Sequence, residues 1–145
     1  EPIKNCYKAM EFLEKRFEVE KVSNFYETEP IPKSNQAMYV NGVVSVKTNF
    51  LPKKILSELM NIEKIFKRVR HFKNESRVID LDLLCFNDLI SRDKHLQLPH
   101  PRMHLRRFVM QPLCDINKEW VHPLLKEKAK NILKKLANQK IYNIN

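Results

Sequence analysis

Two aspartates at alternate positions, Asp80 and Asp82, interrupt the apolar stretch RVIDLDLLCF. If this stretch is a β-strand, the two side chains point to the same face, about 6.6 Å apart along the strand. Mg²⁺ takes a few carboxylate oxygens and leaves its other positions to water and substrate phosphates, and two such ions can bridge a phosphate chain. These residues alone leave a second interpretation open, a half-exposed antiparallel strand whose polar face carries two acids.

Cationic side chains lie on both sides of this pair in the sequence: Arg68, Arg70, Lys73 and Arg77 before it, and Arg102, Arg106 and Arg107 after it. The planar guanidinium group of arginine matches the oxygens of a phosphate. Because Arg68 and Arg77 flank the paired carboxylates, we predict a phosphate-binding role for both. For Arg70, Lys73 and Arg107 we predict a structural role, in which they neutralise the aspartates or cap the C-terminus of a helix.

Four further positions have side chains that suit a bound ligand. His100 stands between two prolines in LPHPRMH, and the prolines restrict the backbone around it. Tyr39 and Asn41 are two residues apart in a predicted strand, and Phe108 follows the arginine cluster. Two aromatic rings and an amide can hold a flat heterocycle by stacking and edge hydrogen bonds. The alternatives are an ordinary loop histidine, aromatic core residues and an asparagine at a strand end.

The composition limits the kinds of site that are available. Gly42 is the only glycine, so the chain has no glycine-rich phosphate loop and no dinucleotide-binding fingerprint. A nucleotide must therefore be held by side chains and metal. The formal net charge of +10 favours anionic partners, although we attribute about half of it to solvated lysines in KEKAKNILKKLANQK.

Length and composition predict a single soluble domain over residues 1–145, with 43% hydrophobic and 30% charged residues. No apolar run approaches the roughly 20 residues that cross a bilayer, so we expect no membrane association. The three cysteines are odd in number and far apart, which is typical of reduced thiols in a cytoplasmic protein.

The hydrophobic periodicity predicts an α+β fold. Helical spacing covers residues 3–17, 52–68 and 122–139, a strand is predicted over residues 77–86, and the stretches EVEKVSNFYET and AMYVNGVVSVKTNF are predicted partners in a β-hairpin. The type of RRFVMQPLCDI stays undetermined. This order matches a ferredoxin-like β-α-β-β-α-β sandwich with a mainly antiparallel sheet and with its first strand missing from the chain.

Taken together, SNFYETEPIP, YVNGVV, SRVIDLDLLCF and LPHPRMHLRRFVMQPL, in this order and spacing, resemble the 6-hydroxymethyl-7,8-dihydropterin pyrophosphokinases of folate biosynthesis. The resemblance runs from the first helix to about Ile116. It implies transfer of the β,γ-diphosphate of ATP to the pterin hydroxymethyl group, with release of AMP. It also implies a cytoplasmic enzyme, which in some chains is fused to or associated with other folate enzymes.

The resemblance also implies roles for individual residues. Asp80 and Asp82 match the ligands of two Mg²⁺ ions, and Arg68 and Arg77 match the catalytic cations over the transferring phosphates. The residues that match the ATP-binding side of the family are Glu63, His100 and Arg106. Those that match its pterin pocket are Thr28, Ile31, Tyr39, Asn41 and Phe108.

A non-catalytic RNA- or phosphate-binding ferredoxin-like module is the alternative from another functional class. Sheets of this type can bind RNA through exposed aromatic residues inside a basic patch. Asp80 and Asp82 would repel a phosphate backbone unless metal intervenes, and for this reason we expect no nucleic-acid partner.

Overall fold

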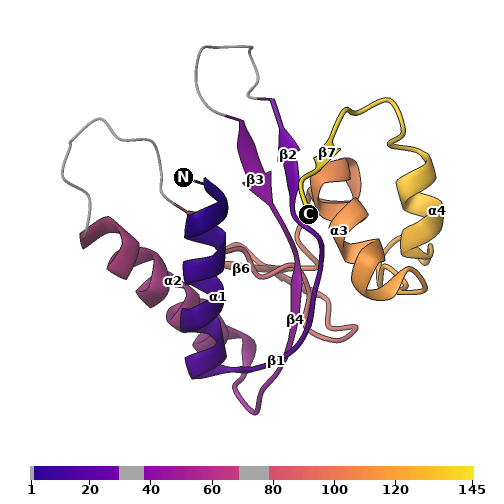
Figure 1. The fold of residues 1–145 in the computed structure, drawn as a ribbon. Helices are drawn as coiled ribbons and strands as arrows, with labels where there is room; N and C mark the ends of the chain where they lie inside the picture. Colours follow the sequence, from indigo (N-terminus) through magenta and orange to yellow (C-terminus); the bar gives the residue numbers. More distant parts are fainter. Residues whose placement is uncertain (1, 30–37, 69–78) are drawn as a thin grey trace.

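The computed structural model describes residues 2–29, 38–68 and 79–145. Within these ranges the chain forms three layers (Figure 1). Helices α1 (Pro2–Arg16) and α2 (Pro52–Arg68) cover one side of the strands, and α3 (Arg107–Asn117) and α4 (Ala129–Lys134) cover the other. Two separate clusters of buried side chains, one on each side, form the hydrophobic core. The predicted α+β class with antiparallel sheets is confirmed.

Both N-terminal helices follow the predicted periodicity, and their bounds agree closely with the predicted ranges of residues 3–17 and 52–68. Each helix begins at a proline, whose missing N–H is not needed in the first helical turn. Their buried residues recur at intervals of three or four positions, so each helix buries a single face. The cluster consists of Ala9, Leu13, Phe17, Ile55, Leu59, Ile62 and Phe66.

The predicted hairpin is confirmed, but it is divided into two ladders. Antiparallel pairing joins β1 (Glu18–Val22) to β4 (Val44–Lys47) and β2 (Tyr26–Thr28) to β3 (Tyr39–Asn41), and β7 (Tyr142–Asn143) pairs with the other edge of β2. Between the ladders, residues 23–25 face residues 42–43. The Ser23 hydroxyl accepts the N–H of Val43 at 2.8 Å, and the N–H of Ser23 donates to the Val43 carbonyl at 2.9 Å. A side chain thus satisfies a backbone group at the irregularity.

Neighbouring residues of the strand layer pack into different cores. Val44 and Val46 contact the α1–α2 cluster, whereas Val43 contacts the α3–α4 cluster. The segment 79–84 shows the same alternation, because Leu83 packs toward α1 and α2 and Leu84 toward α3 and α4. The segment therefore lies in the same layer as the strands.

The predicted strand over residues 77–86 is wrong as a hydrogen-bonded element. Residues 79–85 form no ladder with any strand in the described ranges, and residues 77 and 78 lie outside them. The alternating burial is nevertheless present: Ile79 and Leu81 are half-buried, while Asp80 and Asp82 are exposed. Alternation in sequence encodes which side chains are buried, whereas a ladder also needs a second backbone alongside.

The predicted last helix, residues 122–139, is also wrong in extent, because α4 covers only Ala129–Lys134. Upstream of it, Lys126 has a positive φ of 58° and the His122 N–H donates to the Glu127 carbonyl at 2.9 Å. This backbone turn prevents a helix from starting at residue 122.

The stretch of undetermined type forms α3, with Pro112 inside it. Three short elements were not predicted: β5 (Ser91–Asp93), its antiparallel partner β6 (Leu96–Leu98), and the 3₁₀ turn η1 (Met103–Leu105). No helix in the described part of the chain has the length and apolar character to cross a bilayer.

Candidate functional site

A small hollow of about 90 Å³ brings together six of the predicted site residues. We call it the carboxylate hollow. Its walls come from the end of β3, the segment 79–84, the loop after β6 and the first turn of α3. The lining residues are Asn41, Gly42, Val43, Asp80, Asp82, Leu84, His100, Arg106, Phe108 and Val109.

Asp80 and Asp82 both line the hollow, and the backbone segment that carries them is held in place on its other side. The N–H of Leu81, the residue between them, donates to Glu63 Oε2 at 3.1 Å. Glu63 belongs to α2, so this bond ties the aspartate segment to a packed helix. The side chain of Leu81 packs against the α1–α2 core. Both restraints act on one residue and leave Asp80 and Asp82 exposed on the opposite face.

His100 is held by two backbone contacts. Its N–H donates to the Leu84 carbonyl at 2.7 Å, and its Nδ1 accepts the N–H of Arg102 at 3.2 Å. An acceptor at Nδ1 places the imidazole hydrogen on Nε2 in the neutral ring. Burial lowers the pKa of His100, and nearby Asp82 acts in the opposite direction. The ring is therefore neutral at pH 7, with Nε2–H available as a donor.

The opposite wall is formed by Arg106, Phe108 and Gly42. The guanidinium carbon of Arg106 lies 5.4 Å from the centroid of the Phe108 ring, within the range of a cation–π contact. A Cβ atom added to Gly42 would lie 2.6 Å from the Cδ1 atom of Phe25. Sequence reasoning gave this glycine no place in the site, although an isolated glycine in a predicted strand is a signal for close backbone approach.

Of the other predicted site residues, those whose side chains the structure describes do not line the carboxylate hollow. Tyr39 is 52% exposed and pairs across the β2–β3 ladder with Thr28. Arg68 is the last residue of α2, and its side chain lies outside the described structure. Ile31 and Arg77 fall in the ranges 30–37 and 69–78, which are likewise outside it.

Arg107 has the kind of structural role that was predicted for it, with a different partner. Its Nη1 donates to the carbonyl oxygens of Ala137 and Gln139, at 3.2 and 2.7 Å. The arginine thus ties the start of α3 to the chain after α4 and does not neutralise the aspartates. Arg70 and Lys73, for which a structural role was also predicted, fall outside the described ranges.

The metal ligands that the hollow offers are the carboxylate oxygens of Asp80 and Asp82. In the described part of the chain, no group of three or more His, Cys, Asp or Glu side chains could hold a metal ion. Two carboxylates are nevertheless a suitable donor set for Mg²⁺, which usually completes its shell with water and substrate phosphates.

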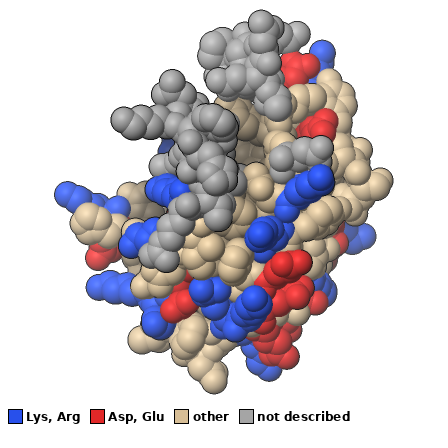
Figure 2. Space-filling model, turned by 60° about the vertical axis from the view of Figure 1, so that its left-hand side comes forward, with Lys and Arg blue, Asp and Glu red and all other residues tan. Residues whose placement is uncertain are grey.

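Cationic side chains are mixed with acidic ones over the surface that Figure 2 shows. Ion pairs also neutralise part of the charge of the molecule: Glu58 binds both Arg16, at 3.0 Å, and Lys54, at 3.2 Å. The face in Figure 2 is therefore not a continuous basic surface, in spite of the net charge of +10.

Comparison with known proteins gives the same family as the sequence motifs. A model of the family described as 7,8-dihydro-6-hydroxymethylpterin-pyrophosphokinase (HPPK) matches residues 1–118. A 2-amino-4-hydroxy-6-hydroxymethyldihydropteridine pyrophosphokinase of Aquifex aeolicus is 39% identical over 123 residues, which cover 85% of this chain and 77% of the relative. A protein of the same name from Haemophilus influenzae is 35% identical over 123 residues, covering 85% of this chain and 76% of the relative.

Some relatives are much longer. The folic acid synthesis protein FOL1 of Dictyostelium discoideum is 36% identical over 121 residues, 83% of this chain but only 18% of the relative. The family model covers most of the chain, and the Aquifex relative exceeds 30% identity over most of both proteins. The chain belongs to the 7,8-dihydro-6-hydroxymethylpterin-pyrophosphokinase family.

Proposed function

We propose that this chain transfers the β,γ-diphosphate of ATP to the hydroxymethyl oxygen of 6-hydroxymethyl-7,8-dihydropterin, and that the phosphates lie in the carboxylate hollow. Pyrophosphokinase function in folate biosynthesis follows from family membership. The placement is supported by one observation: Asp80, Asp82, His100 and Arg106 line the same hollow, together with Asn41 from the distant strand β3.

Asp80 and Asp82 would hold Mg²⁺. The exposed carboxylates fit this ion, and the resemblance in sequence implies two ions per active site. When bound, the metal supplies charge neutralisation for the phosphate chain. The Glu63–Leu81 hydrogen bond supports a further role for Glu63, because it fixes the backbone between the two ligands.

The other polar residues of the hollow bind and orient ATP. His100 donates from Nε2 to a phosphate or ribose oxygen, since its Nδ1 is occupied by the Arg102 N–H. Arg106 supplies a permanent positive charge next to it. Arg68 and Arg77 lie over the transferring phosphates in this proposal. The role of Arg68 is supported by its position at the end of α2, because the same helix carries Glu63. Catalysis then consists of positioning and electrostatic stabilisation while the substrate hydroxyl attacks in line.

The pterin ring lies between Phe108 and Tyr39 in this proposal, and the amide of Asn41 reads its edge. Asn41 and Phe108 both line the carboxylate hollow, which supports a pterin site continuous with the phosphate site. The pairing of Tyr39 with Thr28 places these two residues on adjacent strands that lead to Asn41. Ile31 completes the pocket with its backbone.

We also propose the full ferredoxin-like topology, with a further strand between β4 and the segment 79–84. Two observations support it. Within the described residues β4 pairs only with β1, and the side chains of β4 and of the segment 79–84 pack against the same α1–α2 core. A single domain over residues 1–145 and a cytoplasmic location stay predictions. Association with other folate enzymes is supported by the longer FOL1 relatives.

The test is an assay of AMP release from Mg-ATP by this protein, with and without 6-hydroxymethyl-7,8-dihydropterin. We expect AMP release that depends on the pterin. No AMP release from a protein preparation that melts cooperatively would contradict the proposal.

An RNA-binding module, the alternative function, is favoured only by the net charge of +10, whereas family membership favours the enzyme. It is tested by the binding of short RNA as a function of salt. A steep salt dependence that is indifferent to Mg²⁺ and pterin would favour this function over the enzyme.

A further inference from the structure

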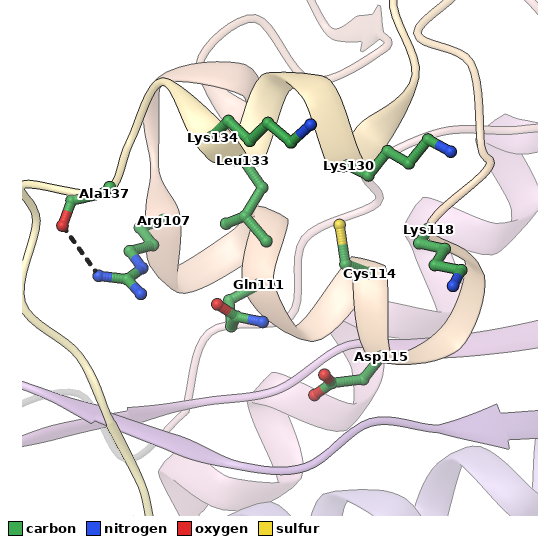
Figure 3. Close-up of a pocket in the computed structure, with 9 residues that line it drawn as sticks. All are labelled: Arg107, Gln111, Cys114, Asp115, Lys118, Lys130, Leu133, Lys134 and Ala137. Carbon is green, nitrogen blue, oxygen red and sulfur yellow. Dashed lines mark hydrogen bonds between the residues drawn. The ribbon is translucent and has the colours of Figure 1, made fainter.

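A second, larger hollow of about 430 Å³ lies between α3 and α4 (Figure 3). We call it the lysine hollow. It shares no lining residue with the carboxylate hollow. One of its walls is α4, which begins after residue 118, where the match to the family model ends.

The rim of the lysine hollow carries four cations, Arg107, Lys118, Lys130 and Lys134, and a single carboxylate, that of Asp115. Asp115 is already engaged, because its Oδ2 accepts the hydroxyl of Tyr26 at 2.6 Å. The hollow therefore has an excess of positive charge, and like charges held close together favour the binding of an anion.

Two of these cations are available to a ligand. Lys130 is paired with Glu119 at 2.8 Å, and Arg107 donates to backbone carbonyls. Among the described residues, neither Lys118 nor Lys134 forms an ion pair, and both are exposed. The ammonium groups on the two sides of the hollow can therefore turn toward an anion without breaking an existing ion pair.

The floor of the hollow is less polar than its rim. Leu133 points from α4 toward α3, and the sulfur of Cys114 points from α3 toward α4 (Figure 3). Burial, with a further contribution from Asp115, raises the pKa of the Cys114 thiol, so the thiol is neutral at pH 7. A ligand here meets cations at the edge and weakly polar atoms beneath.

We propose that the lysine hollow binds a small phosphate-bearing molecule. Its phosphate lies against Lys118 and Lys134, with Lys130 nearby, and its less polar body covers Leu133 and Cys114. This site is independent of the pterin pyrophosphokinase reaction proposed for the carboxylate hollow.

Nuclear magnetic resonance of the ¹⁵N-labelled protein tests the proposal, with AMP as the probe and EDTA present to exclude metal-dependent binding. We expect saturable shifts of the backbone amides of residues 107–118 and 130–137. Inorganic phosphate should bind more weakly than AMP, because it lacks a body to cover the floor, and adenosine should bind most weakly, because it lacks the phosphate.

The test variant replaces Lys118 and Lys134 with glutamine, and the matched control replaces Lys53 and Lys94, two exposed lysines elsewhere on the surface. We expect AMP affinity at the lysine hollow to fall about tenfold or more in the first variant, because two charge-assisted contacts are lost, and to be unchanged in the second. Equal losses in both variants would show a general charge effect and overturn the proposal. So would shifts confined to the region of Asp82, or equal affinities for adenosine and AMP.

Discussion

The two hollows present opposite charges to a ligand. The carboxylate hollow is lined by two aspartates, a neutral histidine and an arginine that stacks on Phe108, whereas the lysine hollow has four cations and one engaged carboxylate. The first suits phosphates that arrive with metal ions, and the second suits phosphates that bind directly to ammonium groups. A basic net charge therefore does not by itself locate a phosphate site, because the proposed catalytic hollow is the acidic one.

The substitution Asp82→Asn is expected to have the largest effect, because it removes a carboxylate from the proposed metal site. We expect turnover in the AMP-release assay to fall about 100-fold or more, since a lost electrostatic contact to the reacting phosphates has effects of this order. The melting temperature should change little, because the side chain is exposed. The control is Asp88→Asn, an exposed aspartate in a turn. Unchanged turnover in Asp82→Asn would show that Asp82 holds no catalytic metal ion. The two hollows would then not differ in the way that we propose, by binding phosphate with or without metal.

The substitution Gly42→Ala tests how closely Gly42, which lines the carboxylate hollow, is packed against Phe25. The new Cβ would lie 2.6 Å from the ring of Phe25, which is buried. We expect the free energy of unfolding to fall by about 1–3 kcal/mol, the usual cost of overpacking, as measured by urea denaturation. Adding Phe25→Leu should recover part of that loss. If the single variant is as stable as the parent, Gly42 and Phe25 are not packed as closely as the structure shows.

The substitution Tyr26→Phe removes the hydrogen bond that occupies Asp115 of the lysine hollow. Burial, together with Asp115, raises the pKa of Tyr26 to about 12, so the hydroxyl is a donor at every pH of interest. We expect a loss of about 1 kcal/mol in the free energy of unfolding, typical of one hydrogen bond. Tyr142→Phe, at an exposed tyrosine of β7, serves as the control. Equal stability of the two variants would show that Asp115 is not held by Tyr26.

The pH dependence of stability is expected to be the smallest effect, and it concerns the loop before α4. His122 is 2% exposed, and its Nδ1 accepts the N–H groups of Leu124 and Leu125. Burial, together with the nearby His104, lowers the pKa of His122, while Glu127 acts in the opposite direction. The folded state therefore binds a proton less readily than the unfolded chain. The stability that His122 contributes is complete above pH 6.5 or so and is lost as the pH falls below it.

Urea denaturation at pH 7.5, 6.5 and 5.5 measures this contribution. We expect the parent protein to lose more stability on acidification than His122→Asn does. His95→Asn, at an exposed histidine in the β5–β6 turn, should behave like the parent. Identical pH profiles for all three proteins would show that His122 does not titrate in this way.

Much of the carboxylate hollow was predictable from local patterns. The alternation around Asp80 and Asp82 correctly predicted which side chains are exposed, and the two helical periodicities gave nearly correct bounds for α1 and α2. The contact of Glu63 with Leu81 could not be predicted, because it joins residues 18 positions apart through a backbone group that every residue possesses. The ladder predicted for residues 77–86 failed for a related reason, since pairing depends on a second segment and not on the strand's own sequence.

The lysine hollow was less predictable. Pro112 lies inside α3. Because a proline inside a helix is uncommon, the sequence did not indicate that this stretch is helical. The lysines of KEKAKNILKKLANQK are predicted to be solvated, and Lys134 is indeed exposed, but Lys130 and Lys134 also border the hollow, as Lys118 does. A lysine-rich helix has the same sequence pattern whether it faces bulk water or another element across a hollow.

The alternation of Val43 and Val44 between the two cores has a consequence for how the molecule unfolds. Each core consists mainly of residues from one pair of helices, and either core could melt separately if the strand layer did not join them. Because adjacent residues of one ribbon are anchored in different cores, neither core can loosen without disturbing the backbone that supports the other. Heat and denaturant should therefore unfold the two cores in one cooperative transition.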